Sequence, residues 1–193
     1  MQIYGDLKSG NCLKVKWTAD LLGLRYTWRS IDIMKGESRT AGYLAKFPQG
    51  QVPAVEFDDG RTLAQSNAII RYLARGSRLL PDEAFTQAKI DEWLFWEQYS
   101  HEPYVATCRF HMLYLGKPKE TRDPAKVERG EKALDHMERM LAGRSFLVGD
   151  TLTIADIALY AYTHVAHEGG FDLAPRPHVR AWLARCQTEL AHV

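Results

Sequence analysis

The chain has 193 residues, a formal net charge of +1 at pH 7 and 46% apolar side chains. This length and composition allow a sizeable core in one domain or in two small ones. The balanced charge and the lack of a basic run exclude nucleic acid as the main partner. No apolar stretch is typical of a membrane span or a signal segment, and Cys12, Cys108 and Cys186 form no disulfide framework. We therefore expect a cytoplasmic protein.

The first part of the chain alternates between strand and helix patterns. Residues 1–4 are typical of a strand, residues 12–22 of a helix with apolar positions every four residues, and residues 26–31 of a second strand. Because a helix lies between these strands, we expect a parallel crossover. We predict an irregular segment over residues 32–47.

A β-hairpin is predicted next. Residues 54–57 and 62–64 are short apolar runs, and Asp58-Asp59-Gly60 between them supplies the Asp-Gly pair that suits positive φ angles. Pro53 precedes the first strand, where its missing N–H does least harm, and an X-Pro bond is the kind that adopts cis at low cost. A cis bond would turn the Val52 backbone outward, where it could pair with an extended peptide.

A helix is predicted to begin directly after the hairpin, at Gln65 and Ser66. Free N–H groups and the helix dipole attract a carboxylate to such a helix N-terminus. The alternative is that Ser66 is an ordinary N-cap and Pro53 an ordinary edge proline. Their joint occurrence at this spacing favours a binding site for a peptide-like ligand.

These residues resemble the cytosolic glutathione transferases, and more closely the bacterial serine-type or theta-like classes. The resemblance covers almost the whole chain and implies a thioredoxin-like α/β domain over residues 1–76. It implies that the Val52 backbone pairs with the cysteinyl backbone of glutathione, beside cis-Pro53, and that Gln65 and Ser66 hold the γ-glutamyl end. Glutathione would be the co-substrate.

The turn before the first helix, Lys8-Ser9-Gly10-Asn11-Cys12, is where a thiolate would be stabilised. Lowering a thiol pKa by about two units requires about 2.7 kcal/mol, which a helix dipole and one hydroxyl donor can supply. The spacing resembles a Cys-x-x-Cys motif with serine first, and it resembles serine-type transferases, so Ser9 is the first candidate. Asn11 and Cys12 remain alternatives; an apolar packing role is the competing interpretation of Cys12.

Two further side chains are candidates for the glycine carboxylate of glutathione. Lys35 carries a flexible ammonium and Gln51 an amide. A solvated loop charge is an equally good interpretation of Lys35. Phe47-Pro48 stands where relatives carry Asn-Pro, which would alter this loop or place an aromatic ring in a dimer contact.

The remainder of the chain shows only helical patterns. We predict a linker over residues 77–85 and an all-helical domain over residues 86–193. Its helices include residues 126–141, a buried stripe from Ile154 on, and a last helix after Pro177. Thr153 and Asp156 are predicted to form a capping box, which is a structural role.

The second substrate is expected against this helical domain. Tyr99 and Tyr104 would stack on an electrophile and Arg109 would hold its anionic part, although core packing of the tyrosines is the alternative. Pro103 is expected to bend the helix. The roles of His101 and its neighbour Glu102 stay open. We expect no metal site, because His164-x-x-His167-Glu168 lacks a third convincing ligand.

The predicted function is a glutathione transferase that adds the glutathione thiolate to a small hydrophobic electrophile, as in detoxification. Glutathione-dependent reduction of a peroxide or disulfide is one alternative, and a non-catalytic ligand- or protein-binding relative is another. The resemblance implies a homodimer. The electrophile itself cannot be predicted from these residues.

Overall fold

The computed structural model describes residues 1–191 and divides into two compact units, Met1–Ser77 and a second unit beginning at Arg78. In the first unit, a four-stranded sheet has the order β2-β1-β3-β4. Its strands are β1 (Gln2–Gly5), β2 (Thr27–Ser30), β3 (Ala54–Glu56) and β4 (Thr62–Ala64). β1 and β2 are parallel, and the other two pairings are antiparallel. The predicted crossover and hairpin are therefore confirmed.

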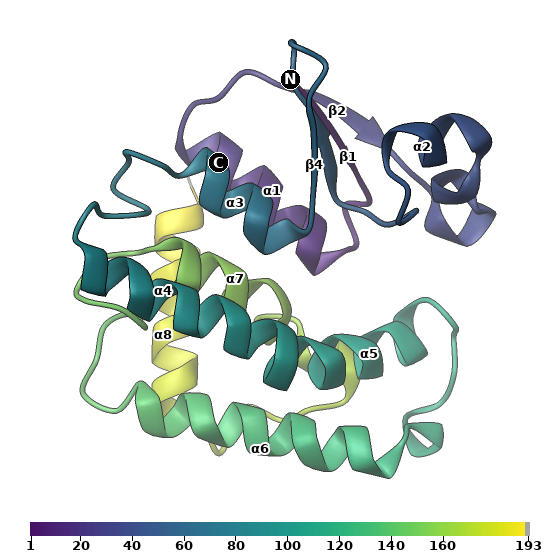
Figure 1. Ribbon diagram of the computed structural model, residues 1–193. Helices are drawn as coiled ribbons and strands as arrows, with labels where there is room; N and C mark the ends of the chain where they lie inside the picture. The colour runs from purple at the N-terminus through teal and green to yellow at the C-terminus, as the bar shows by residue number, and fades with distance from the viewer. Residues whose placement is uncertain (192–193) are drawn as a thin grey trace. The chain divides into compact units, whose positions relative to one another are not determined.

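Two helices cover one face of this sheet. α1 (Gly10–Leu21) and α3 (Ser66–Leu73) lie side by side in Figure 1. Ile3 of β1 and Val55 of β3 are fully buried, as are Val15 of α1 and Ile69 of α3. The predicted helix at residues 12–22 in fact begins at Gly10, because Ser9 caps it.

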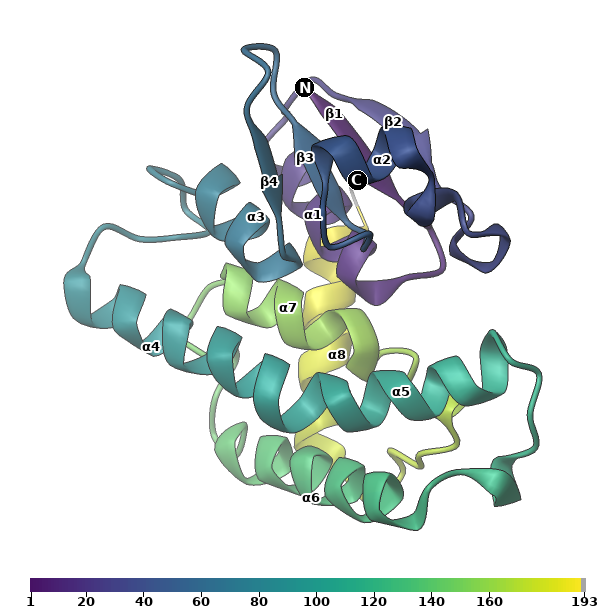
Figure 2. The same cartoon turned by 45° about the vertical axis from the view of Figure 1, so that its right-hand side comes forward.

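The other side of the strands carries a short helix in the segment predicted to be irregular. α2 (Ala41–Lys46) follows two 3-10 turns, η1 (Ile33–Lys35) and η2 (Glu37–Arg39), and lies on the opposite side of the sheet from α1 (Figure 2). Phe47 is only 4% exposed and its ring lies 5.2 Å from that of Tyr4. The dimer-contact interpretation of Phe47 is therefore wrong, because this ring belongs to the core of its own domain.

Over residues 78–191, the second unit contains helices joined by turns and loops, and no strand. Its helices are α4 (Ala84–Trp96), α5 (Glu102–Leu113), α6 (Pro124–Met140), α7 (Ile154–Thr163) and α8 (Pro177–Leu190), with short 3-10 turns η4 (Lys119–Thr121) and η5 (Ala166–Gly169). The fold of an N-terminal thioredoxin-like domain followed by an all-helical domain is confirmed. α4 begins two residues inside the linker that we predicted. Within residues 1–191, every helix is too short or too polar to cross a bilayer.

A π-helical turn, η3 (Glu97–His101), joins α4 to α5, and the two helices run end to end beside α6 (Figure 2). Pro103 stands in the first turn of α5. Proline has no N–H and its ring crowds the preceding turn, so a regular α-helix cannot continue through it. The predicted disturbance near Pro103 therefore takes the form of a wider turn just before it.

The predicted capping box at the start of α7 is present. Asp156 is fully buried, and its Oδ2 accepts a hydrogen bond from the Thr153 backbone N–H at 2.9 Å. Its Oδ1 accepts from the Trp182 ring N–H at 2.9 Å and from the Leu147 backbone N–H at 2.8 Å. Burial raises the pKa of this carboxyl, and the four residues form one hydrogen-bonded unit. Asp156 thus joins α7 to α8 as well as capping α7.

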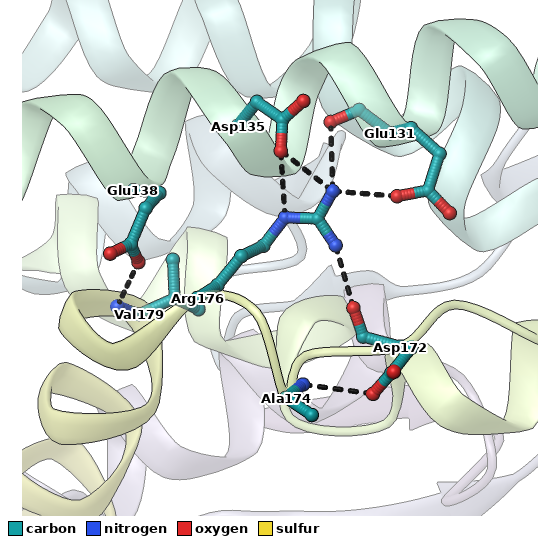
Figure 3. Close-up of polar contacts among 7 residues, drawn as sticks. All are labelled: Glu131, Asp135, Glu138, Asp172, Ala174, Arg176 and Val179. Atoms are coloured by element: carbon teal, nitrogen blue, oxygen red, sulfur yellow. Dashed lines mark hydrogen bonds and ion pairs between the residues drawn. The ribbon is translucent and has the colours of Figure 1, made fainter.

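An arginine joins α8 and its preceding loop to α6. Arg176 is 7% exposed, and its guanidinium contacts Glu131 Oε2 at 2.6 Å and Asp135 Oδ1 at 2.7 Å (Figure 3). It also donates to the Asp172 carbonyl at 2.6 Å. Glu138 accepts from the Val179 backbone N–H at 2.9 Å and so caps the start of α8. These contacts hold the beginning of α8 in place.

Candidate functional site

Ser9 stands at the N-cap of α1 with an extended backbone, φ −83° and ψ 120°. Its hydroxyl oxygen accepts a hydrogen bond from the Cys12 backbone N–H at 3.4 Å. An N-cap serine acts as an acceptor, so its own O–H proton can still be donated to a negatively charged atom. Ser9 therefore combines a hydroxyl donor with the positive end of the α1 dipole.

Asn11 and Ser66 connect the starts of α1 and α3. The Ser66 hydroxyl donates to Asn11 Oδ1 at 3.1 Å, although 55 positions separate the two residues in the chain. Ser66 is 5% exposed. Two residues predicted for different parts of the site are thus in direct contact.

Cys12 is fully buried, and its Sγ accepts from the Asp6 backbone N–H at 3.4 Å. Burial raises the pKa of this thiol to about 11. A thiol with so high a pKa is protonated at neutral pH, and the thiolate is the reactive form. The geometry favours the packing interpretation of Cys12 over a reactive one.

The Val52–Pro53 peptide bond is cis, as expected from the sequence. Pro53 is buried and Val52 is half-buried at the entrance to β3. The neighbouring Gln51 is exposed, and its carbonyl accepts from the Tyr43 hydroxyl at 2.7 Å. This hydrogen bond fastens the segment before β3 to α2.

Gln65 has a left-handed backbone with φ 70° and ψ 111°. Such a conformation in a non-glycine residue costs about 1–3 kcal/mol and is concentrated at ligand sites. The Gln65 side chain donates to Gln49 Oε1 at 2.8 Å and makes no capping bond to α3. The N-terminus of α3 is therefore left without a cap from Gln65, as a site for an anion requires.

Lys35 lies on η1 and is well exposed. Its Nζ lies 3.2 Å from Asp32 Oδ2 of the same short segment. An exposed pair of this kind contributes little to stability. The contact matches the solvated-loop interpretation, while a role toward the glycine carboxylate stays a prediction.

Lys14 and Asn67 were not among the predicted site residues. Lys14 is fully buried on α1, and its Nζ donates to Asn67 Oδ1 at 3.3 Å. Asn67 follows Ser66 in the first turn of α3. The sequence did not single out Lys14, because a lysine in a helix is normally expected to be exposed to solvent.

Comparison with known proteins places this geometry in one family. The model described as "Glutathione S-transferase, N-terminal domain" matches residues 9–75, and that of the C-terminal domain matches residues 119–185. Glutathione S-transferase 3 of Zea mays is 32% identical over 94% of this chain and 86% of its own length. The chain belongs to the glutathione S-transferase family.

Solved structures of bacterial family members agree with this assignment. A glutathione S-transferase from Pseudomonas fluorescens is 50% identical, with a TM-score of 0.93 over 97% of this chain and 94% of its own. One from Xanthobacter autotrophicus is 44% identical, with a TM-score of 0.92 over 96% of this chain and 92% of its own.

In this family member, the residues expected to contact the second substrate have different surroundings. Tyr99 is 82% exposed. The Tyr104 hydroxyl accepts from Arg129 Nη1 at 3.0 Å, and the same guanidinium lies 5.5 Å from the ring centre. Arg109 is 7% exposed and its Nε donates to Glu168 at 2.6 Å. Tyr99 is thus accessible, whereas Tyr104 and Arg109 take part in contacts within the helical domain.

A group of exposed apolar side chains at the end of α5 and just after it was missed in the sequence. Phe110, Leu113 and Leu115 are 38%, 43% and 44% exposed. The Phe110 ring stacks on Tyr114 at 4.9 Å. Runs of aromatic and leucine residues in a helix usually indicate core, which is why the pattern did not single them out.

Two histidines of the helical domain, His101 and His164, have structural surroundings. His101 is fully buried, and its Nε2 lies 3.0 Å from Thr163 Oγ1. His164 stacks on Tyr160 at 4.6 Å, and its Nδ1 lies 2.8 Å from the Tyr160 carbonyl oxygen. Across residues 1–191, the structure groups no three His, Cys, Asp or Glu side chains in a way that could hold a metal ion.

Proposed function

We propose that this family member binds glutathione in its N-terminal domain and adds the glutathione thiolate to a hydrophobic electrophile. The observation that carries the proposal is the start of α3. There Gln65 has a left-handed backbone and leaves the helix N-terminus without a cap from its side chain, directly beside Ser66. A helix end of this kind is suited to a carboxylate, and glutathione has one at its γ-glutamyl end.

Ser66 and Val52 would hold the tripeptide at two points. The Ser66 hydroxyl can rotate from Asn11 Oδ1 to a ligand carboxylate, and its backbone N–H lies at the positive end of α3. The Val52 backbone would pair with the cysteinyl backbone as an added strand does. Gln65, Gln51 and Lys35 would supply weaker polar contacts at the two ends of glutathione.

Ser9 would stabilise the thiolate. A dipole contribution of up to about 2 kcal/mol and a charge-assisted hydrogen bond of about 1.5–3 kcal/mol together cover the 2.7 kcal/mol or so that a shift of two pKa units requires. Asn11 is the alternative donor. A mixed disulfide at Cys12 is disfavoured, because that side chain is fully buried and its pKa is raised to about 11.

The electrophile would pack against exposed apolar surface of the helical domain. Tyr99 is the most exposed of the three predicted residues, and Phe110 and Leu113 of α5 are also exposed. Aromatic and leucine side chains favour a hydrophobic compound over a charged one. Tyr104 and Arg109 would serve mainly to hold this part of the domain in shape.

The test is a comparison of three activities on one preparation: conjugation to 1-chloro-2,4-dinitrobenzene, reduction of cumene hydroperoxide and reduction of a glutathione mixed disulfide. We expect conjugation to be the fastest of the three activities. Glutathione binding with none of the three activities would instead indicate a non-catalytic relative. Absence of glutathione binding in calorimetry contradicts the proposal altogether.

We also propose that two copies pair in solution and that the protein works in the cytoplasm. Phe85 and Phe95 of α4 are 72% and 75% exposed, and pairing would remove such rings from water. All three cysteines are free and buried, which suits a reducing compartment. Light scattering at micromolar concentration should give twice the 22.0 kDa chain mass; a monomer there contradicts the pairing.

A further inference from the structure

Lys14 of α1 is fully buried, and it is the only buried lysine within residues 1–191. Lysine is almost never fully buried, since removing its ammonium from water is unfavourable unless polar groups replace the water. Its Nζ donates to Asn67 Oδ1 at 3.3 Å. Its burial therefore places a cationic group beside the first turn of α3.

Two contacts join the same faces of α1 and α3. Asn11 and Lys14 are one turn apart on α1, and their partners Ser66 and Asn67 are consecutive on α3. The first contact orients the serine proposed to bind the glutamyl carboxylate. The second contact brings the Lys14 ammonium group to Asn67, the residue that follows this serine.

The position of this ammonium is unfavourable for α3 in isolation. A helix N-terminus carries about half a positive elementary charge, so a cation there is destabilising and an anion stabilising. A bound carboxylate would interact favourably with both the helix end and the ammonium. The low-dielectric surroundings of a buried group strengthen that attraction compared with water.

We infer that Lys14 is a positioning residue for glutathione: through Asn67 it orients the first turn of α3, and its charge strengthens the attraction of this helix end for the glutamyl carboxylate. The inference rests on the proposed function. It adds Lys14, which lies outside the predicted site, and its proposed role depends on the glutamyl carboxylate of the ligand. If Lys14 were only a structural link between α1 and α3, its loss would weaken the binding of ligands with and without this carboxylate equally.

The first experiment separates these two roles with a pair of ligands. Glutathione is compared with γ-aminobutyryl-cysteinylglycine, which lacks only the carboxylate of the glutamyl residue. Calorimetry gives the Kd of both ligands for the wild type, Lys14→Met, Lys14→Arg and Lys16→Met. Lys16 is the matched control, because it lies on the same helix but pairs with Asp20, away from α3.

We expect the preference of the wild type for glutathione over this analogue to fall about tenfold in Lys14→Met, a change of about 1.4 kcal/mol. Lys14→Arg keeps the charge and should retain most of the preference, and Lys16→Met should leave it unchanged. An unaltered preference in a folded Lys14→Met protein overturns the inference. A wild type that binds neither ligand contradicts the proposed function instead.

Asn67→Asp provides a second test that does not depend on removing a buried side chain. The new carboxylate lies in the first turn of α3, where negative charge stabilises a helix, so the melting temperature should be maintained or raised. It would compete with the ligand for Lys14 and repel the glutamyl carboxylate. We expect glutathione binding to weaken about tenfold and analogue binding to change less. Equal weakening for both ligands overturns the inference.

Discussion

The Ser66 hydroxyl donates to the amide oxygen of Asn11 at 3.1 Å, across 55 positions of the chain. One residue begins α3 and the other lies in the first turn of α1, so the two helix N-termini are held next to each other. Both helix ends are positive, as the proposed sites for the glutamyl carboxylate and the thiolate require. Glutathione carries both groups.

Ser66→Ala should weaken glutathione binding about tenfold to a hundredfold, because a hydrogen bond to a charged group contributes about 1.5–3 kcal/mol. Calorimetry measures the change. Ser77→Ala is the control, because Ser77 follows α3 and its hydroxyl donates to the Ala74 carbonyl at 2.7 Å. Equal weakening in both variants would point to a general loss of stability.

Ser9→Ala should leave glutathione bound while raising the pKa of its thiol by about one to two units, since a charge-assisted donor to the thiolate is lost. Loss of the N-cap should also lower the free energy of unfolding by about 1 kcal/mol. Thiolate absorbance near 240 nm, followed against pH, gives the pKa. An unchanged pKa would show that Ser9 is not the donor, and the same titration of Asn11→Ala would then test Asn11.

Cys12→Ala should retain conjugation activity and should alter how stability depends on pH. The folded thiol has a pKa raised by burial to about 11 from an ordinary value of 9.0, so the folded state keeps its proton where the unfolded state loses it. The associated stability is present below pH 9 and is lost as pH rises toward 11, by up to about 3 kcal/mol. Urea unfolding at pH 8 and pH 10.5 should show a smaller decline in Cys12→Ala than in the wild type. Parallel declines would mean that this thiol does not titrate as its burial implies.

Arg176→Met should lower the free energy of unfolding by about 1–3 kcal/mol without reducing glutathione affinity. The substitution removes the ion pairs with Glu131 and Asp135 and the hydrogen bond to the Asp172 carbonyl (Figure 3). Both carboxylates are partly exposed, so water can solvate them after the loss. Guanidinium unfolding provides the measurement. Arg180→Met, at an exposed position of α8, should have less than a third of the effect; similar losses in the two variants would contradict the role of the network.

Several features of the site followed from local pattern. The Asp-Gly turn, the proline before β3 and the helix start at Ser66 depend on neighbouring residues only, so sequence predicted them, as it did the Thr153 capping box. The segment over residues 32–47 was predicted wrongly, since α2 depends on Tyr43 and Phe47 packing against Tyr4 of a distant strand. Tertiary packing outweighs weak local propensity in so short a helix.

The sequence by itself determined the order of the four strands with α1 and α3, the division into two domains and the family resemblance, because each rests on periodicity, turn chemistry or motif spacing along the chain. Only the tertiary structure decided that Cys12 is buried, that Asn11 contacts Ser66 and that Lys14 reaches Asn67. Burial and contacts between helices depend on how α1 packs against α3. A helical pattern in the sequence indicates which residues share one face of a helix. Which other helix packs against that face depends on the tertiary fold.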